Sequence, residues 1–428
     1  MSATREKMEW IHSANIYEVN LRQYTKEGTF DAFAQELPRL KDMGVQVLWL
    51  MPITPIATEK MKGTMGSYYA CSDYTAVNPE FGTLDDFKNL VNEAHRQGFK
   101  LIIDWVANHT GWGHVWTKSN PEYYLHNEDG SFHAASGMDD IIELDFNNPD
   151  LRSAMIDAMK FWVTECNIDG FRCDLASWVQ VDFWQEARPL VDAIKPLFWL
   201  GEFDEIENPE HGKIFDASYS WKWMHKTRDF YDHRQPLHEL IELLDQYDAI
   251  GNDSMRAWFT TNHDENSWNG TEFEKYGDMA KLLAVFSCTW NGIPLLYSGQ
   301  ELPLVDKRLA FFDKDPIPWT GRYAMHGFYK KLLQLHAEHP ALRGGDDKAA
   351  TIRLQTTADY KILAFLRKNE SDEVLVILNW SGDALHFHLT DNRASGIFNE
   401  LFSGVLNDFD MNKNFEIQPW EYWVFVKA

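Results

Sequence analysis

Four short segments of the chain each end an apolar run in residues that can perform acid–base chemistry. They are LIIDWVANH, DGFRCD, FWLGE and FTTNHD, and they end at His109, Asp174, Glu202 and Asp264. Each segment is typical of a buried parallel strand whose last residues turn polar. If the strands belong to one barrel, their carboxyl ends meet on one face, where the three carboxylates would lie together. Carboxylates gathered in a cleft suit glycoside hydrolysis, in which one attacks or stabilises the sugar and another protonates the leaving group.

Strand-like and helix-like segments alternate through most of the chain, which indicates a parallel sheet with helical crossovers. Amphipathic helices are predicted between the strands, for example over 29–44 and 83–98, because each begins at Thr with an acidic first turn and ends at Gly. The number of predicted strands matches the α/β fold of a TIM (β/α)8 barrel. These strands cover residues 14–20, 45–51, 100–106, 168–174, 198–203, 214–219, 257–262 and 293–298.

Two regions depart from this alternation. Residues 110–147 are rich in Trp, His, Gly and Asn, and they predict a small inserted domain after strand 3 that walls the cleft. After His339, alternating apolar runs separated by turn signals predict a C-terminal antiparallel β-sandwich. We expect the sandwich to pack against the barrel, with starch binding as the alternative. The predicted domains are therefore a barrel of residues 1–109 and 148–339, an insert of 110–147 and a sandwich of 340–428.

Composition excludes several classes of partner. The 428 residues carry a formal net charge of −25, which argues against a nucleic-acid or anionic-membrane partner and fits a neutral ligand. No run of about 18 apolar residues is present, so no membrane span is predicted. The first 20 residues lack an apolar signal-peptide core, and the four Cys lack metal-binding spacing. These features predict a cytoplasmic protein with reduced cysteines, or a secreted or periplasmic one if a leader had been trimmed.

The four strand-end segments resemble the motifs of the α-amylase family of glycoside hydrolases (family 13). The family's DxVxNH, GFRxD, a Glu after the fifth strand and xxNHD after the seventh occur here in that order. GIPLLYSGQE, ELDFNNP and the Tyr69-x-x-x-Asp73-Tyr74 spacing match as well, and the resemblance extends from Ile11 to the C-terminus. It implies a retaining enzyme that cleaves α-glucosidic bonds, with α-1,4 bonds as the leading expectation, in starch fragments or maltooligosaccharides.

The resemblance implies a role for each carboxylate. Asp174 is the nucleophile, Glu202 is the general acid and then the base, and Asp264 stabilises the transition state through sugar hydroxyls. On a strand Arg172 and Asp174 share one face, so we expect the guanidinium to lower the pKa of Asp174. Burial and two neighbouring carboxylates should raise the pKa of Glu202, as a general acid requires. A separation of about 5–5.5 Å between nucleophile and acid would give double displacement with retention.

Further residues are implied to bind or position the substrate: Tyr69, Asp104, His109, Arg172 and His263. The two histidines would bind the sugar in the cleaving subsite, and Tyr69 would stack against it, with Tyr68 as the alternative. Asp104 would hold Arg172 or neighbouring side chains in place.

The chain departs from the family near the predicted nucleophile. Ser177 and Trp178 stand where many members have Lys-His, which removes a contact to the sugar beyond the cleaved bond. The family's structural calcium is left open, because Asn108 matches a ligand position but Glu143 stands where Asp is usual. The chemistry itself requires no cofactor.

Two other functions share this pattern. A 4-α-glucanotransferase or other transglycosylase would use the same residues, with a sugar hydroxyl in place of water. A catalytically inactive carbohydrate-binding protein would be expected to lack one of the three carboxylates, and all three are present. The sequence leaves bond preference, endo or exo action and oligomeric state open.

Overall fold

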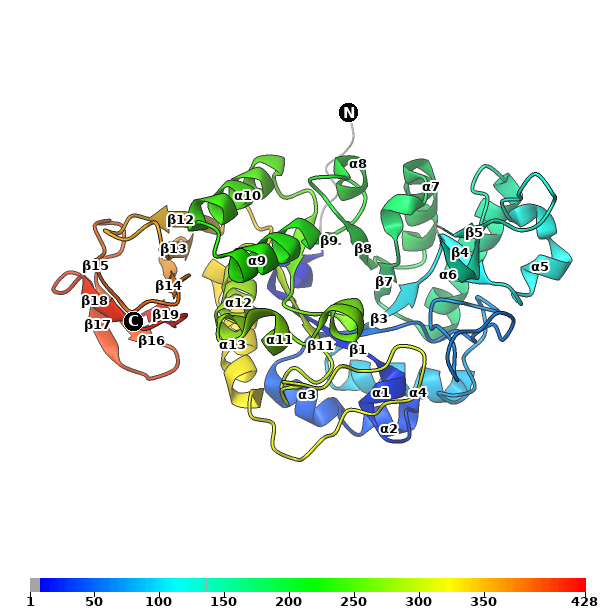
Figure 1. Ribbon diagram of the computed structural model, residues 1–428, viewed down its shortest axis with the longest axis horizontal. Helices are drawn as coiled ribbons and strands as arrows, with labels where there is room; N and C mark the ends of the chain where they lie inside the picture. Colours follow the sequence, from blue (N-terminus) through cyan, green and yellow to red (C-terminus); the bar gives the residue numbers. More distant parts are fainter. Residues whose placement is uncertain (1–7, 136) are drawn as a thin grey trace.

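A closed barrel of parallel strands forms the centre of the molecule (Figure 1). The computed structural model describes residues 8–135 and 137–428. Around the barrel the strand order is β1-β11-β10-β9-β8-β7-β3-β2, which confirms the predicted TIM barrel. The strands are β1 (Ile16–Val19), β2 (Val47–Leu50), β3 (Lys100–Trp105), β7 (Gly170–Cys173), β8 (Phe198–Asp204), β9 (Ala217–Tyr219), β10 (Met255–Trp258) and β11 (Ile293–Tyr297).

Helices surround the barrel and cover its outer face. In α4, the Thr83 side chain accepts the Asp86 N–H while the Asp86 carboxylate accepts the Thr83 N–H, a capping box that fixes the start of the helix. The same helix buries Phe87, Leu90 and Val91 on one face, as its sequence period predicts. The main helices are α2 (Phe30–Ala34), α3 (Leu37–Met43), α4 (Leu84–Arg96), α6 (Pro149–Cys166), α7 (Val181–Asp192), α9 (Trp221–His233), α10 (Leu237–Ile250), α11 (Glu272–Tyr276), α12 (Met279–Thr289) and α13 (His326–Glu338). Two single-turn helices, α1 (Leu21–Tyr24) and α8 (Pro209–Gly212), follow β1 and β8.

The single helix predicted over 29–44 is wrong, because the structure divides it into α2 and α3. Pro38 is the cause: it has no N–H to donate, and its ring would collide with the carbonyl of Ala34 in a continuous helix. The chain therefore restarts, with Pro38 in the first turn of α3. The helix then ends at Gly44, whose φ of +94° allows a left-handed cap.

The predicted insertion after strand 3 forms a small sheet of its own, seen in cyan in Figure 1. Its strand order is β4-β6-β5, with antiparallel pairing throughout. The elements are β4 (His109–Gly111), α5 (Trp116–Ser119), η2 (Pro121–Tyr123), β5 (Ala134–Ala135) and β6 (Met138–Glu143). The chain returns to the barrel through α6, whose first turn is capped by the Asn148 side chain.

The C-terminal region is an antiparallel β structure, as predicted, and lies at one end of the molecule (Figure 1). One sheet has the order β12-β13-β14-β19-β16-β17, and β15 pairs with β18 in a second. The strands are β12 (Ala350–Leu354), β13 (Ile362–Asn369), β14 (Asp372–Asn379), β15 (Leu385–His388), β16 (Ile397–Glu400), β17 (Leu406–Asp408), β18 (Asn414–Ile417) and β19 (Tyr422–Lys427). The residue limits given above for the three domains stay a prediction.

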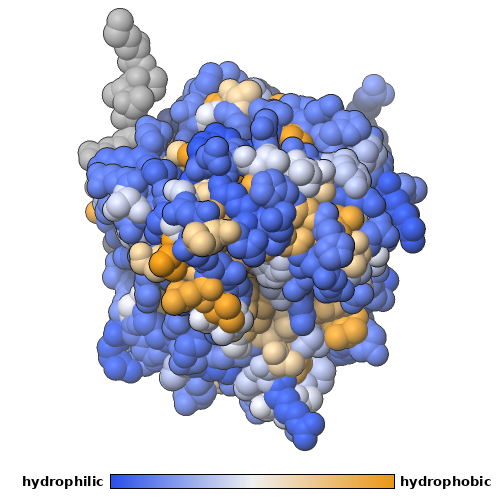
Figure 2. All heavy atoms as spheres, turned by 90° about the vertical axis from the view of Figure 1, so that its left-hand side faces the viewer, coloured by the Kyte–Doolittle hydropathy of each residue, from blue (hydrophilic) through white to orange (hydrophobic). Residues whose placement is uncertain are grey.

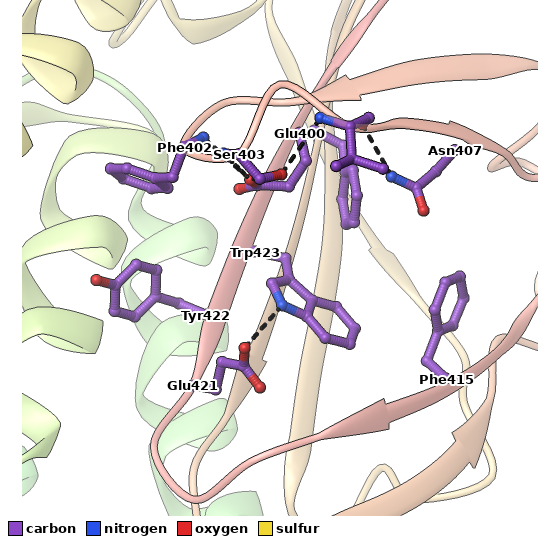
Figure 3. A pocket seen from close by; sticks show the side chains of 10 residues that line it. Glu400, Phe402, Ser403, Asn407, Phe415, Glu421, Tyr422 and Trp423 are labelled. Carbon is purple, nitrogen blue, oxygen red and sulfur yellow. Dashed lines mark hydrogen bonds between the residues drawn. The ribbon is translucent and has the colours of Figure 1, made fainter.

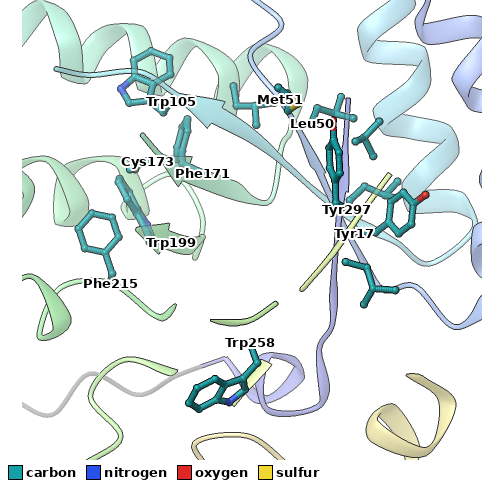
Figure 4. Close-up of a cluster of buried hydrophobic side chains, with 14 of the residues drawn as sticks. Tyr17, Leu50, Met51, Trp105, Phe171, Cys173, Trp199, Phe215, Trp258 and Tyr297 are labelled. Atoms are coloured by element: carbon teal, nitrogen blue, oxygen red, sulfur yellow. The ribbon is translucent and has the colours of Figure 1, made fainter. Parts of the chain in front are cut away.

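Aromatic side chains dominate the core between the barrel and its helices. Trp105, Phe171, Trp199, Phe215 and Trp258 are all buried there (Figure 4). Alternate residues of the same strands point into the barrel and form a separate cluster, because successive side chains of a strand face opposite ways. Many of the 18 Trp therefore serve packing. All four cysteines are buried and unpaired, and no helix in the described part of the chain is long and apolar enough to cross a membrane.

Close contact between β7 and β8 depends on Gly170. A Cβ at this position would lie 2.0 Å from the backbone oxygen of Phe198, so the strands would have to separate. We predict that Gly170→Ala lowers the free energy of unfolding by roughly 1–3 kcal/mol, the usual cost of overpacking. As a control, Gly327→Ala in α13 meets no atom within 4 Å and should be neutral or stabilising by up to about 1 kcal/mol. Chemical denaturation of the two variants measures the difference, and equal stabilities would contradict the steric argument.

Candidate active site

The carboxyl ends of neighbouring barrel strands bring the predicted residues together. Asp104 of β3 pairs in register with Arg172 of β7, and Asp174 follows β7 directly. Glu202 lies on β8, the next strand of the barrel, and Asp264 follows β10 after a short loop. Residues 90 positions apart in the sequence therefore share one face of the barrel, as the predicted fold requires.

Arg172 lies at the centre of this group and is fully buried. Its Nη1 donates to both Asp104 oxygens, at 2.9 and 3.1 Å, and to Asp174 Oδ1 at 2.9 Å. Its Nη2 lies 2.9 Å from Glu202 Oε2, an ion pair whose angles do not make a hydrogen bond. The rings of Trp49 and Tyr219 lie 4.9 and 5.4 Å from the guanidinium carbon. One cation thus holds three carboxylates in fixed directions.

Leu175 makes a strained turn directly after Asp174. Its φ of +40° and ψ of +45° place it in the left-handed region, which costs a branched residue about 1–2 kcal/mol. The turn aims the Leu175 N–H at Glu202 Oε2, to which it donates at 2.9 Å. Backbone strain of this kind is concentrated at functional sites. Here it gives Glu202 Oε2 a hydrogen-bond donor beside its ion pair with Arg172.

His263 connects Asp264 to the opposite side of the barrel. Its Nδ1 lies 2.5 Å from Glu18 Oε1 on β1, and its Nε2 lies 2.8 Å from the Tyr69 hydroxyl and 3.3 Å from Asp264 Oδ2. The Tyr69 hydroxyl in turn donates to Asp104 Oδ2 at 3.0 Å. Burial disfavours the charged ring, but Asp264 and Glu18 raise the pKa of His263 to about 9. The ring is therefore an imidazolium at neutral pH, and both nitrogens are donors.

Burial also raises the pKa values of the central carboxyls. The pKa of Asp174 rises to about 6 because desolvation outweighs the effect of Arg172, so the prediction of a lowered value is wrong. Desolvation raises the pKa of Glu202 to about 7; Arg172 opposes this rise, and Asp174 and Asp264 add to it. The raised value for Glu202 agrees with the expectation from its apolar strand. Between these two pKa values Asp174 is mainly ionised while Glu202 keeps its proton.

Tyr69 and His109 occupy different environments. The Tyr69 ring is stacked on His263, with ring centroids 5.3 Å apart, whereas the Tyr68 hydroxyl turns away to Asn20. Burial lowers the pKa of His109 to about 4, so its ring is neutral. Its Nδ1 lies 3.2 Å from the Asn108 amide, and its Nε2 has no hydrogen-bond partner among the described residues. His109 is thus held as a neutral ring apart from the charged network.

Several residues of this site were not predicted from the sequence. Glu18 lies within the predicted strand 14–20. A carboxylate inside an apolar run was the sequence signal that could have placed it in the site. Trp49 donates its indole N–H to Asp104 Oδ2 at 3.2 Å, and strand alternation could have placed it inside the barrel. Phe311 stacks against Tyr69 at 6.2 Å and contacts the exposed Trp268 at 5.4 Å. Phe311 comes from a long irregular loop that carries no periodic signal.

The resemblance left a structural calcium ion near Asn108 open. Asn108 Nδ2 donates to His109 Nδ1 at 3.2 Å, so its Oδ1 is the atom that could bind a cation, and Glu143 Oε2 lies 2.8 Å from His133 Nδ1. Within residues 8–135 and 137–428, no group of three or more His, Cys, Asp or Glu is arranged to hold a metal. Calcium takes six to eight oxygen ligands, and backbone carbonyls, amide oxygens and waters count among them as well as carboxylates. No step of the chemistry below uses a metal.

Taken together, the group contains a carboxyl with a pKa of about 6, a second carboxyl with a pKa of about 7 and a third carboxylate. Asp174 and Glu202 are almost buried, whereas the Asp264 side chain is 38% exposed. A ligand that enters from the surface therefore meets Asp264 first. Such a site can transfer a proton and form a covalent bond to an electrophilic carbon within the same cluster.

Comparisons with known proteins agree with this geometry. The family model described as "Alpha amylase, catalytic domain" matches residues 15–129 and 119–383. Alpha-amylase 3 of Dictyoglomus thermophilum is 26% identical over 86% of this chain and 85% of its own length. Neopullulanase 2 of Thermoactinomyces vulgaris is 27% identical over 83% of this chain and 63% of its own length. Among solved structures, the maltogenic alpha-amylase AmyB of Thermotoga neapolitana has a TM-score of 0.88 at 27% identity, covering 98% of this chain and 99% of its own. The structure of an alpha-amylase from Lactobacillus plantarum has a TM-score of 0.86 at 27% sequence identity, and the match covers 98% of this chain and 100% of that structure.

Glu18 and Asp264 hold His263 in its charged form, which leads to a prediction. Glu18→Gln removes one of the two negative charges and should lower the pKa of His263 below about 9. An NMR titration of the labelled histidine ring measures the shift. The pKa of His263 in the folded protein exceeds the ordinary value of 6.5. The protonated ring therefore stabilises the fold fully below pH 6.5, and this stabilisation is lost as the pH rises through 9.

The matched control is Asp42→Asn, which removes the partner of His326 at 2.8 Å on the surface. It should leave the pKa of His263 unchanged. A pKa of His263 that stays near 9 in Glu18→Gln would show that Glu18 does not hold the charge.

Proposed function

Because the chain belongs to the α-amylase family of glycoside hydrolases, we propose that it hydrolyses α-glucosidic bonds, most simply α-1,4 bonds, in starch fragments or maltooligosaccharides. The observation that carries this proposal is the cluster of Asp174 and Glu202 around Arg172, with different pKa values for the two carboxyls. Two carboxyls that bind the two terminal nitrogens of one guanidinium support double displacement, which retains the configuration at the sugar carbon and requires carboxyls about 5–5.5 Å apart.

In the first step, ionised Asp174 attacks the anomeric carbon while Glu202 gives its proton to the departing glycosidic oxygen. One C–O bond forms and another breaks, which leaves a glycosyl ester on Asp174 and a free sugar hydroxyl. In the second step, Glu202, now a carboxylate, takes a proton from water as the water oxygen attacks the same carbon. The ester bond breaks, Asp174 leaves as a carboxylate and both groups return to their starting states.

The surrounding residues suit the binding of a neutral sugar. The partly exposed carboxylate of Asp264 can accept hydrogen bonds from sugar hydroxyls, and the ring of His109 adds no charge to the site. We propose that Tyr69, backed by the ring of His263, presents a flat apolar face to the sugar in the cleaving subsite. Asp104 acts through Arg172, because it binds the guanidinium and not the open side of the site.

The preference for α-1,4 glucans draws on the relatives as well as on the site. The structural relatives above are named as alpha-amylases, one of them maltogenic, and the sequence relatives include a neopullulanase. Trp268 is exposed and continues the aromatic surface of Phe311, which suits stacking against further sugar rings of a chain.

Product analysis tests the proposed function. Incubation with maltoheptaose should release shorter maltooligosaccharides, first as the α-anomer, in a time course followed by chromatography and proton NMR. Asp174→Asn should lower turnover at least 10³-fold, because the nucleophile is lost, while the melting temperature changes little. The same residue pair would serve a transglycosylase, which would instead form products longer than the substrate. β-Anomeric products, or substantial activity in Asp174→Asn, would exclude the mechanism.

The pH dependence of kcat/KM tests the assignment of acid and nucleophile. Activity should fall as the pH drops below about 6, because Asp174 becomes protonated, and should fall above about 7, because Glu202 loses its proton. Glu202→Gln should be nearly inactive on maltoheptaose but should cleave α-maltosyl fluoride, whose leaving group needs no acid. With that substrate the high-pH limb should disappear, since Gln does not titrate. If the activity of Glu202→Gln still fell at high pH, the group that titrates there would not be Glu202.

A further inference from the structure

The long loops that follow β2 and β11 join each other at the carboxyl end of the barrel. Both strands pair with β1, so the joined loops lie over β1. The Met65 N–H donates to the Phe312 carbonyl at 3.0 Å. Thr64 donates its N–H and its hydroxyl to Asp313 Oδ1, at 2.8 and 2.6 Å. Gly63 packs against the same segment, since a Cβ there would lie 2.5 Å from Phe312 Cβ. We call these joined segments, residues 62–66 and 310–313, the bridge.

The helical turn that follows β1 supports both halves of the bridge. Arg22 of α1 is fully buried, and its Nη1 donates to the Gly66 carbonyl at 3.1 Å. The next residue, Gln23, is also buried and donates from Nε2 to the carbonyls of Ala310 and Asp313, at 2.8 and 2.7 Å. Buried donors are costly to leave unpaired, so the two loops are held where α1 places them.

A further attachment ties the bridge to the inserted domain. Lys62 Nζ lies 2.9 Å from Asp139 Oδ1 and 2.8 Å from Asp140 Oδ1, and both carboxylates belong to β6. The insertion follows β3. Segments that follow four neighbouring strands, β11, β1, β2 and β3, are therefore connected on this side of the barrel.

Loops on the opposite side of the barrel are much shorter. Only Ser220 separates β9 from α9, and residues 205–208 separate β8 from α8. By comparison, the two loops that form the bridge run over 51–83 and 298–325. A loop of one to four residues cannot rise far above the ends of its strands, because each residue spans at most about 3.6 Å. The loops therefore form a high wall over β1 and add little height over β8 and β9.

This asymmetry has a direction relative to the proposed chemistry. β1 lies four places from β8 in both directions around the barrel, so the bridge stands opposite Glu202. Glu202 protonates the departing oxygen, and the leaving part of the sugar chain therefore lies on the β8 side. The part that becomes bonded to Asp174 extends toward β1, and its non-reducing end faces the bridge.

Phe311 places the bridge directly beside the cleaving subsite. Its ring centroid lies 6.2 Å from that of Tyr69 and 6.3 Å from that of His263, with angles of 18° and 32° between the ring planes. The same ring meets Tyr68 edge to face at 5.8 Å. Because Tyr69 is the residue proposed to stack against the sugar, Phe311 borders the next position toward the non-reducing end.

We propose that the bridge closes the site on its non-reducing side, so that the enzyme removes short sugars from chain ends and does not cut within a chain. An interior bond could reach Asp174 only if the chain continued through the bridge, where Phe311 and its neighbours exclude it by steric contact. This inference rests on the proposed function, because it names the kind of chain that the carboxylates cleave.

A pocket on the C-terminal domain supplies a control residue (Figure 3). Phe402 lines this pocket, is half-buried like Phe311, and stacks on Phe328 of α13 with ring centroids 5.5 Å apart. In the surface view from this end of the molecule, hydrophobic residues form small separate patches within a hydrophilic surface (Figure 2). Truncation of Phe402 thus removes a ring of the same size without touching the bridge.

Hydrolysis of an end-blocked chain tests the proposal on the unmodified protein. The probe is a p-nitrophenyl maltoheptaoside whose non-reducing 4- and 6-hydroxyls carry a benzylidene group, and the reference is the same compound with these hydroxyls free. The kcat/KM for the blocked chain should be at least tenfold lower, since the block meets the bridge. The free chain should release one short sugar of constant length from its non-reducing end, as resolved by chromatography.

The two ways in which this experiment could fail are distinct. A difference of less than tenfold between the blocked and the free chain overturns the proposal and leaves the proposed function intact. If neither chain is cleaved, the proposed function fails, and the inference that rests on it falls as well.

Opening the bridge should remove the discrimination. Phe311→Ala combined with Asp313→Ala deletes the ring beside Tyr69 and the acceptor of Thr64, so the ratio of blocked to free kcat/KM should rise at least fivefold. Phe311→Leu combined with Asp313→Asn keeps an apolar side chain and a side-chain oxygen and should retain the original ratio, as should Phe402→Ala. The ratio compares two substrates on one protein, so a loss of folded protein does not affect it. An unchanged ratio in the double Ala variant overturns the role of the bridge.

Discussion

The guanidinium of Arg172 lies buried between three carboxylates, and without it these groups would face one another in a medium of low dielectric. Breaking a buried ion pair by removing one partner typically costs about 3–5 kcal/mol, because the remaining charge is left uncompensated. Arg172 reaches Asp104, Asp174 and Glu202 from a single position inside the barrel. The same contacts that keep the strand ends together therefore fix the directions of the reacting oxygens.

The charge balance of the site then sets its chemistry. Five carboxyls, those of Glu18, Asp104, Asp174, Glu202 and Asp264, share the cations Arg172 and His263. Full ionisation would leave an excess of buried negative charge, so burial raises the pKa values of the innermost groups. Glu202 has the highest value of the three, and it is the group from which the proposed mechanism takes a proton. A proton donor and an ionised nucleophile thus arise in the same cluster from one electrostatic constraint.

The C-terminal domain adds a second polar and aromatic surface to the molecule. Its loops meet the α9–α10 turn, and it is there that Trp420 adopts a left-handed backbone. Leu175 has a backbone of the same kind beside Glu202. At both places the surrounding structure holds a conformation that the isolated residue would avoid.

The sequence by itself determined the barrel, the insertion after its third strand, the C-terminal sheets and the positions of the three carboxylates. Strand periods and polar residues at strand ends are local signals, and Asp174, Glu202 and Asp264 carry them in full. The tertiary structure decided the rest. Desolvation of Asp174, the contact of Glu18 with His263 and the neutral state of His109 depend on groups distant in the chain. The cavity between the barrel and the C-terminal domain is of this kind too, since Gln235 and Trp420 line it together only when the two regions pack. Burial and distance between remote residues set pKa values and pockets, and a linear pattern does not contain them.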